Sequence, residues 1–184
     1  MTSLAAENGA SMTYTPTPSN PSVTTPARLL VVDDESTIRL VLAKYLRTRG
    51  FDVSFAESGE AALEVLGGGG ARFDLMLCDV RMPGLSGVEI IPSALEIDPD
   101  LGIVMLSAVN DAPTATDAMA QGVLDYLIKP IELDQLFDAV NRALHRRTLL
   151  REQRRVEWAI REEVASRTEE LEREKAHLRD LGIG

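Results

Sequence analysis

Five short apolar runs alternate with helical stretches through the middle of the chain, and this alternation limits the fold more than any other feature. The runs are RLLVVD (28–33), FDVSFA (51–56), FDLMLCD (73–79), LGIVMLS (101–107) and VLDYLI (123–128). Runs of this length and apolarity are typical of strands buried on both faces. Strands that alternate with helices predict an α/β fold, a five-stranded parallel doubly wound sheet.

The stretches between these runs show helical spacing. In the first, Ile38, Leu42, Tyr45 and Leu46 share one face, and Gly50 ends the helix. Further helices are expected at about 58–66, at about 87–97, where Pro92 predicts a short or kinked helix, and after Pro113, which suits a first turn.

Residues 131–180 contain neither proline nor glycine and predict one helix from about Glu132, roughly 70 Å long. Its first turns carry a face for the sheet, formed by Leu133, Leu136, Phe137, Val140 and Leu144. A thinner stripe follows, interrupted by Gln153, Arg167 and Glu174 and made of Leu149, Val156, Ile160, Val164, Leu171 and Leu178. Because a lone helix with so thin a stripe is marginal in water, we expect a coiled-coil homodimer over residues 146–184, with a stutter after Ile160.

The remaining composition narrows the setting. Residues 1–27 are rich in Ser, Thr and Pro and predict a disordered tail. The net charge of −10 argues against direct binding to nucleic acid or to an anionic membrane. The chain shows neither a signal peptide nor an apolar run long enough to span a bilayer, and Cys78 is its only cysteine, so we expect a cytoplasmic protein without an internal disulfide.

Three carboxylates follow strands that should be neighbours. Asp33 and Asp34 end the first strand, and Asp79 ends the third. The carboxyl ends of parallel strands form the ligand-binding edge of such a sheet, so these anions should meet there. Clustered carboxylates repel one another, and Mg²⁺, which prefers oxygen ligands, would relieve the repulsion.

Two further polar residues end the other strands of this edge. Ser107 supplies a hydroxyl, and Lys129, before Pro130, supplies a cation. A carboxylate can attack phosphorus to form an aspartyl phosphate, and Mg²⁺ with an ammonium group would neutralise the transferring phosphoryl group. The pattern therefore predicts phosphoryl transfer to Asp79.

The segments VVDDES, LMLCDVRMPGLSG, IVMLSA and GVLDYLIKP resemble the response regulator receiver family of two-component signalling in order and spacing, over residues 28 to about 145. The resemblance implies a flavodoxin-like fold, Mg²⁺ as cofactor and a sensor histidine kinase or phosphotransfer protein as partner. It implies no enzyme activity beyond self-phosphotransfer and dephosphorylation at one aspartate.

The resemblance also implies a role for each matching residue. Asp79 would be the phosphoacceptor, Ser107 the switch hydroxyl, Tyr126 the switch aromatic and Lys129 the phosphate contact, with a cis bond before Pro130. The metal would be held by Asp34 directly, by Asp33 partly through water, by Asp79 and by the backbone carbonyl of Arg81. Arg81 and Val109 depart from the usual residues beside the path of hydrolytic water, which leaves the phosphorylated lifetime open.

Other interpretations remain beside this one. Asp33 and Asp34 could cap the first helix, Tyr126 could be an ordinary core aromatic, and Cys78 should point into the core on the opposite face of its strand. A haloacid-dehalogenase-like phosphatase is disfavoured because the first strand ends in DDES rather than D-x-D. A phosphorylation-independent dimerisation scaffold is the main alternative function. The ending HLRDLGIG leads us to expect a further output module whose kind the sequence does not identify.

Overall fold

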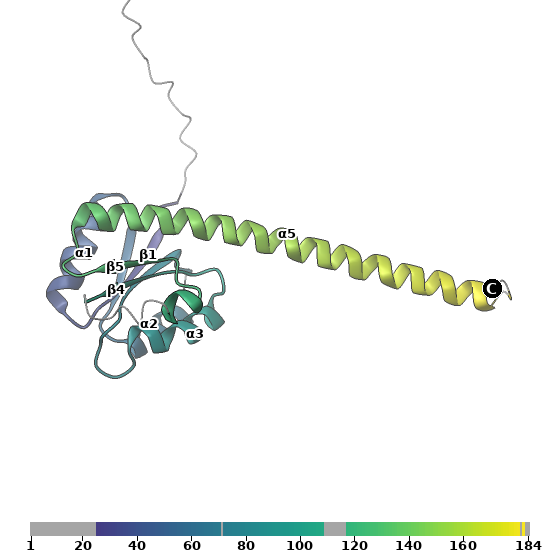
Figure 1. Ribbon diagram of the computed structural model, residues 1–184, viewed down its shortest axis with the longest axis horizontal. Helices are drawn as coiled ribbons and strands as arrows, with labels where there is room; N and C mark the ends of the chain where they lie inside the picture. The colour runs from purple at the N-terminus through teal and green to yellow at the C-terminus, as the bar shows by residue number, and fades with distance from the viewer. Residues whose placement is uncertain (1–24, 71, 109–116, 181, 183–184) are drawn as a thin grey trace, which may run out of the picture.

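The computed structural model describes residues 25–70, 72–108, 117–180 and 182. The predicted tail lies mostly in residues 1–24, and the helix start at Pro113 lies in 109–116, so both fall outside the described residues. The described chain forms one sheet flanked by helices, and a long helix projects from it (Figure 1).

The sheet has five parallel strands in the order β2-β1-β3-β4-β5, which confirms the predicted topology. They are β1 (Arg28–Val32), β2 (Asp52–Ala56), β3 (Leu75–Asp79), β4 (Gly102–Ser107) and β5 (Asp125–Ile128). All residues of β3 and β4 are buried, because these central strands are covered by helices on both faces. The chain winds one way from β1 to β2 and the other way from β3 to β5, so the strand order reverses between β1 and β3.

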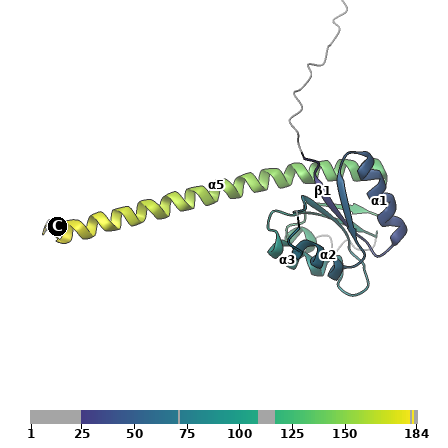
Figure 2. The same cartoon turned by 180° about the vertical axis from the view of Figure 1, so that it is seen from behind.

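Helices cover both faces of the sheet (Figures 1 and 2). The helices are α1 (Ser36–Thr48), α2 (Gly59–Gly67), α3 (Gly87–Ile97) and α5 (Leu133–Asp180), and residues 117–120 are also helical. The apolar core on one face joins α1 and α5 to the sheet, and the core on the other face joins α2, α3 and the helical residue Ala118. Among the described residues, no helix is both long enough and apolar enough to cross a bilayer.

Pro92 does not end its helix, which continues through it for 11 residues and so is not short. Proline removes one backbone donor from a helix. Here Pro92 is exposed, and water can hydrate the carbonyl that loses its partner. A capping box between Ser86 and Glu89 also stabilises the first turn.

The face by which α5 packs on the sheet differs from the predicted one. Its buried residues are Leu136, Ala139, Val140 and Ala143, whereas Leu133 is 36% exposed. Prediction from large side chains alone overlooked the two alanines, whose small size lets the helix approach the strands closely.

Beyond this apolar face, arginines fasten α5 to the amino-terminal end of the sheet. Arg147 pairs with Asp74 at 2.9 Å and donates to the Asp100 carbonyl at 2.6 Å. Arg151 and Arg154 reach the Asp100 carboxylate at 3.5 and 3.3 Å. These contacts hold the helix for about two turns past its last buried residue, and from there it projects away from the domain (Figure 1).

Gly87 marks the tightest turn of the domain. A Cβ atom at this position would overlap the backbone carbonyl oxygen of Asp79, and the Gly87 amide donates to the Val80 carbonyl at 3.0 Å. We expect Gly87→Ala to lower the free energy of unfolding by about 3 kcal/mol, because the overlap involves backbone that cannot rotate away. Urea unfolding followed by circular dichroism measures this. Gly70→Ala is the matched control, since a Cβ at Gly70 meets no atom within 4 Å and should change stability little. Equal stability of the two variants would contradict the argument.

Candidate functional site

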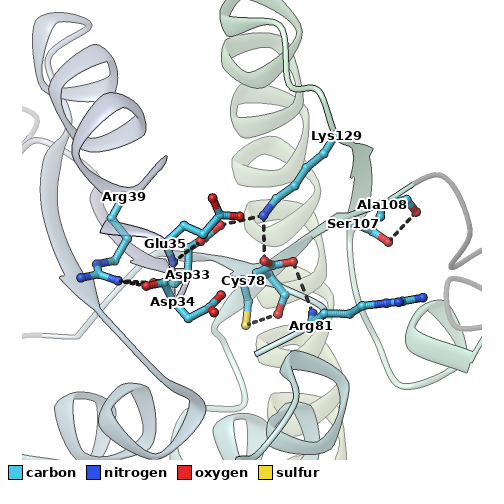
Figure 3. Close-up of polar contacts among 10 residues, drawn as sticks. Asp33, Asp34, Glu35, Arg39, Cys78, Arg81, Ser107, Ala108 and Lys129 are labelled. Carbon is cyan, nitrogen blue, oxygen red and sulfur yellow. Dashed lines mark hydrogen bonds and ion pairs between the residues drawn. The ribbon is translucent and has the colours of Figure 1, made fainter. Parts of the chain in front are cut away.

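Three loops meet at the carboxyl edge of the sheet, where the strand order reverses (Figure 3). Asp33 and Asp34 follow β1, Asp79 is the last residue of β3, and Lys129 follows β5. Alternation along β3 places the fully buried Cys78 in the core cluster with α2 and α3, as predicted.

Lys129 joins the two buried carboxylates. Its Nζ lies 2.7 Å from Oδ2 of Asp79 and 2.9 Å from Oδ2 of Asp33. The side chain of Asp33 is fully buried, that of Asp79 is 9% exposed and that of Lys129 is 21% exposed. Charge-assisted bonds of this kind are strong in a partly desolvated setting, so the ammonium group fixes the separation of strand ends that are far apart in sequence.

The same edge offers a set of ligands suited to a divalent cation. Carboxylate oxygens of Asp33, Asp34 and Asp79 lie within 4.8 Å of one another, and Asp34 is exposed. All three are hard oxygen donors, which Mg²⁺ prefers, and the exposed side leaves room for the water ligands that Mg²⁺ keeps. The donor set therefore fits Mg²⁺, with these three residues as the candidate ligands.

The electrostatics of the site follow from burial. Desolvation raises the pKa of Asp79, and the charge of Asp33 adds to this, while Lys129 and the amide of Arg81 oppose it. Burial alone would lower the pKa of Lys129, but its hydrogen bonds to Asp79 and Asp33 raise it above its ordinary value. Burial, with Asp79 and Asp33 nearby, raises the pKa of the Cys78 thiol, which therefore stays protonated and unreactive.

The predicted switch and metal residues lie around this cluster. Ser107 is fully buried at the end of β4, and its Oγ donates to the Ala108 carbonyl at 3.1 Å. Tyr126 packs partly buried against the core on the side of α2 and α3. The amide of Arg81 donates to Oδ1 of Asp79 at 3.3 Å, and its side chain points away from Asp33 and Asp34 (Figure 3). The Lys129–Pro130 peptide bond is cis, as predicted.

Asp33 and Asp34 do not cap the first helix. Its N-cap is Glu35, which makes no side-chain capping bond. Asp33 instead accepts the amide of Glu35 at 2.9 Å and so closes a local turn just before the helix.

Two positioning residues escaped the sequence analysis. Arg39 on α1 donates to the backbone carbonyls of Asp33 and Asp34 at 2.5 and 3.0 Å and so holds the acidic turn. Gly87 lets α3 begin directly against the backbone of Asp79. Arg39 stood out by neither periodicity nor motif, whereas the MPGLSG segment marked a tight turn without showing which glycine it needed.

An apolar cleft of about 320 Å³ adjoins the site. It lies between α1 and the loop after β5 and is lined by Thr37, Ile38, Val41, Leu42, Lys129, Pro130, Ile131 and Leu133. Lys129 thus contributes both to the carboxylate cluster and to an apolar surface beside it.

Comparison with known families identifies the domain. The response regulator receiver domain family matches residues 29–141, more than half of the chain. The chain belongs to the response regulator receiver family. The resemblance inferred from the four sequence segments is thereby confirmed, as is the flavodoxin-like fold.

Individual relatives agree with this assignment. The transcriptional regulatory protein ZraR of Escherichia coli K12 is 37% identical over 116 residues, which are 63% of this chain and 26% of ZraR. A response regulator receiver domain protein from Clostridium thermocellum superposes with a TM-score of 0.63 and 34% identity, over 67% of this chain and 98% of its own. A structure described as an adenylate cyclase from Rhodopirellula baltica gives a TM-score of 0.66 and 30% identity, over 71% and 96%. The chain spans about a quarter of the length of the curated relatives that it matches.

The raised pKa of Asp79 predicts how stability changes with pH. A carboxyl whose pKa is higher in the folded state binds its proton more tightly there, so it stabilises the fold at low pH. That contribution is lost as pH rises from the ordinary value of 3.8 through the raised folded value. In metal-free buffer, the free energy of unfolding of the wild type should therefore fall relative to that of Asp79→Asn between about pH 4 and pH 7.

Chemical unfolding at a series of pH values measures this difference. The exposed Asp138 provides a control, because Asp138→Asn removes one carboxylate without touching the site. A difference between wild type and Asp79→Asn that stays constant with pH would contradict the electrostatic account.

Proposed function

We propose that this receiver domain accepts a phosphoryl group on Asp79, with Mg²⁺, from a sensor histidine kinase or phosphotransfer protein. The observation that carries the proposal is the bridge from Lys129 to Asp33 and Asp79 beside the carboxylate oxygens of Asp34. The cluster combines a nucleophile, a fixed cation and candidate metal ligands in one place. The apolar cleft beside Lys129 favours a protein as the phosphodonor.

In the transfer step, a carboxylate oxygen of Asp79 forms a bond to phosphorus, and the bond from phosphorus to the donor breaks. Asp79 needs no general base because the reacting carboxylate is the ionised form. Lys129 is placed to follow the charge from the carboxylate to the phosphoryl oxygens. Bound Mg²⁺ would supply further charge neutralisation, held by Asp34, by Asp79, by Asp33 partly through water and by the carbonyl of Arg81.

We further propose that phosphorylation is read out through β4, β5 and α5. Ser107 would turn to the phosphoryl group and Tyr126 would follow it inward, which shifts the population between two states of this face. A physical link to α5 exists next to Tyr126, because Asp125 pairs with Arg142 of α5 at 2.9 Å. A change at β5 therefore acts directly on the base of the long helix.

We propose a receiver over residues 28–145 and a coiled-coil linker over residues 146–184, by which two chains pair. Apolar packing on the sheet ends with Ala143 and Leu144, which supports this division. The large apolar residues beyond are exposed in the single chain, which favours a homodimer. A catalytic output module in a longer protein fits the short coverage of the relatives.

The competing proposal is a scaffold that pairs regardless of phosphorylation. It keeps the same fold and helix but makes no use of the carboxylate cluster. The buried bridge argues against it, because holding two carboxylates and an ammonium group in a core costs free energy that apolar residues would not.

Labelling tests the phosphoryl transfer. Wild-type protein incubated with acetyl phosphate and Mg²⁺ should gain the mass of one phosphoryl group, whereas Asp79→Asn should gain none and chelation of Mg²⁺ should slow the reaction at least about 100-fold. Intact-mass spectrometry measures the product. Asp138→Asn serves as the control and should label like the wild type. Labelling of Asp79→Asn at the wild-type level would refute the proposal.

Light scattering tests whether the receiver controls pairing. With beryllofluoride and Mg²⁺, a mimic of the phosphoryl group, the wild type should shift toward the mass of a dimer, and Asp79→Asn should not respond. A dimer of constant mass in every sample would mean that the helices pair on their own. Signalling would then act by reorienting helices that are already together.

A further inference from the structure

The exposed stripe of α5 lies on a different side of the helix from the receiver domain. Its six members are 45–59% exposed and are Leu149, Val156, Ile160, Val164, Leu171 and Leu178. Arg142 stands 18 residues before Ile160, which is five full turns, so both lie on one side of the helix. Arg142 pairs with Asp125, and Arg146 donates to the Leu124 carbonyl at 2.6 Å. The stripe therefore continues the flank of α5 that faces β5.

The apolar residues of the stripe are arranged symmetrically about Ile160. Val156 and Val164 stand four residues before and after it, and Leu149 and Leu171 stand 11 residues before and after it. When two such helices run in opposite directions with Ile160 facing Ile160, each valine meets a valine and each leucine meets a leucine. The two contact surfaces are then identical and related by a two-fold axis.

The polar residues of the same side follow this symmetry too. Gln153 and Arg167 stand seven residues from Ile160 on either side, and Arg146 and Glu174 stand 14 residues from it. In the antiparallel arrangement Arg167 meets the amide of Gln153, and Glu174 meets the opposite charge of Arg146. Both contacts are favourable or neutral.

A parallel pair in register would place every residue against its own copy. Arg167 would then face Arg167 and Glu174 would face Glu174, at the centre of the contact. Like charges held together in this way destabilise a pair and favour the other orientation. Charge and apolar pattern thus agree on one direction.

We propose that the occupant of this stripe is a second copy of the chain, paired antiparallel about Ile160. The proposal rests on the pairing put forward as part of the proposed function and adds its direction and register. The steps of 11 residues from Leu149 to Ile160 and to Leu171 correspond to about 3.67 residues per turn, which keeps two helices nearly straight along their contact. The two receiver domains lie at opposite ends, and each carboxyl-terminal half runs along the β5 flank of its partner's α5.

Engineered disulfides test direction and register. Cys78 is fully buried and can stay, so the wild type gives the background. Leu149→Cys and Leu171→Cys place thiols about 33 Å apart along one helix, far beyond the reach of a disulfide within one parallel or antiparallel pair unless the matching residue faces them. The two variants are refolded together so that subunits exchange, then oxidised, and covalent dimers are measured on non-reducing gels.

The antiparallel pair predicts at least about fivefold more covalent dimer in the mixture than in either variant alone. Ile160→Cys should crosslink to itself, and Ser166→Cys, on another side of the helix, should not. Crosslinking of Leu149→Cys alone and of Leu171→Cys alone would show a parallel pair and overturn this inference while leaving the proposed pairing intact. Failure of Ile160→Cys to crosslink, with a monomeric mass in light scattering, would refute the pairing itself. Crosslinking at Ile160 without any in the mixture would overturn the proposed register.

Discussion

The bridge from Lys129 to Asp33 and Asp79 is the interaction on which the arrangement of the domain depends. It joins the ends of β1, β3 and β5 through a single ammonium group, at 2.9 and 2.7 Å. Without that cation, two carboxylates, one of them fully buried, would face each other with little water to separate their charges. A core made only of apolar residues would be easier to stabilise, so the cluster is best understood as a cost accepted for the chemistry at Asp79.

Backbone contacts around the cluster serve the same purpose. Arg39 holds the carbonyls of Asp33 and Asp34, and Gly87 allows α3 to start against the carbonyl of Asp79. These residues contribute no reacting group. They fix the loops that carry the charged side chains, because small displacements of a phosphoryl acceptor greatly reduce the rate of transfer.

The long helix connects this edge of the sheet to whatever lies beyond the domain. Its base is joined to β5 through Arg142 and to the opposite end of the sheet through Arg147, Arg151 and Arg154. With contacts at both ends of the sheet, α5 moves with the domain as one body rather than as a flexible tether. A shift of β5 would thus turn the exposed stripe, and a symmetric contact with a second chain would convert that turn into a relative motion of two domains.

The sequence by itself determined the strand order class, the helix boundaries to within a residue or two and the set of charged residues at the sheet edge, because buried strands, helical spacing and motif order are local properties. It also contained the symmetry of the stripe about Ile160. Only the tertiary structure decided which carboxylates Lys129 bridges, that Ala139 and Ala143 form the contact of α5 with the sheet, and that Arg39 and Gly87 position the acidic loops. Those features depend on how segments distant in the chain approach one another, and neither residue type nor spacing encodes that distance.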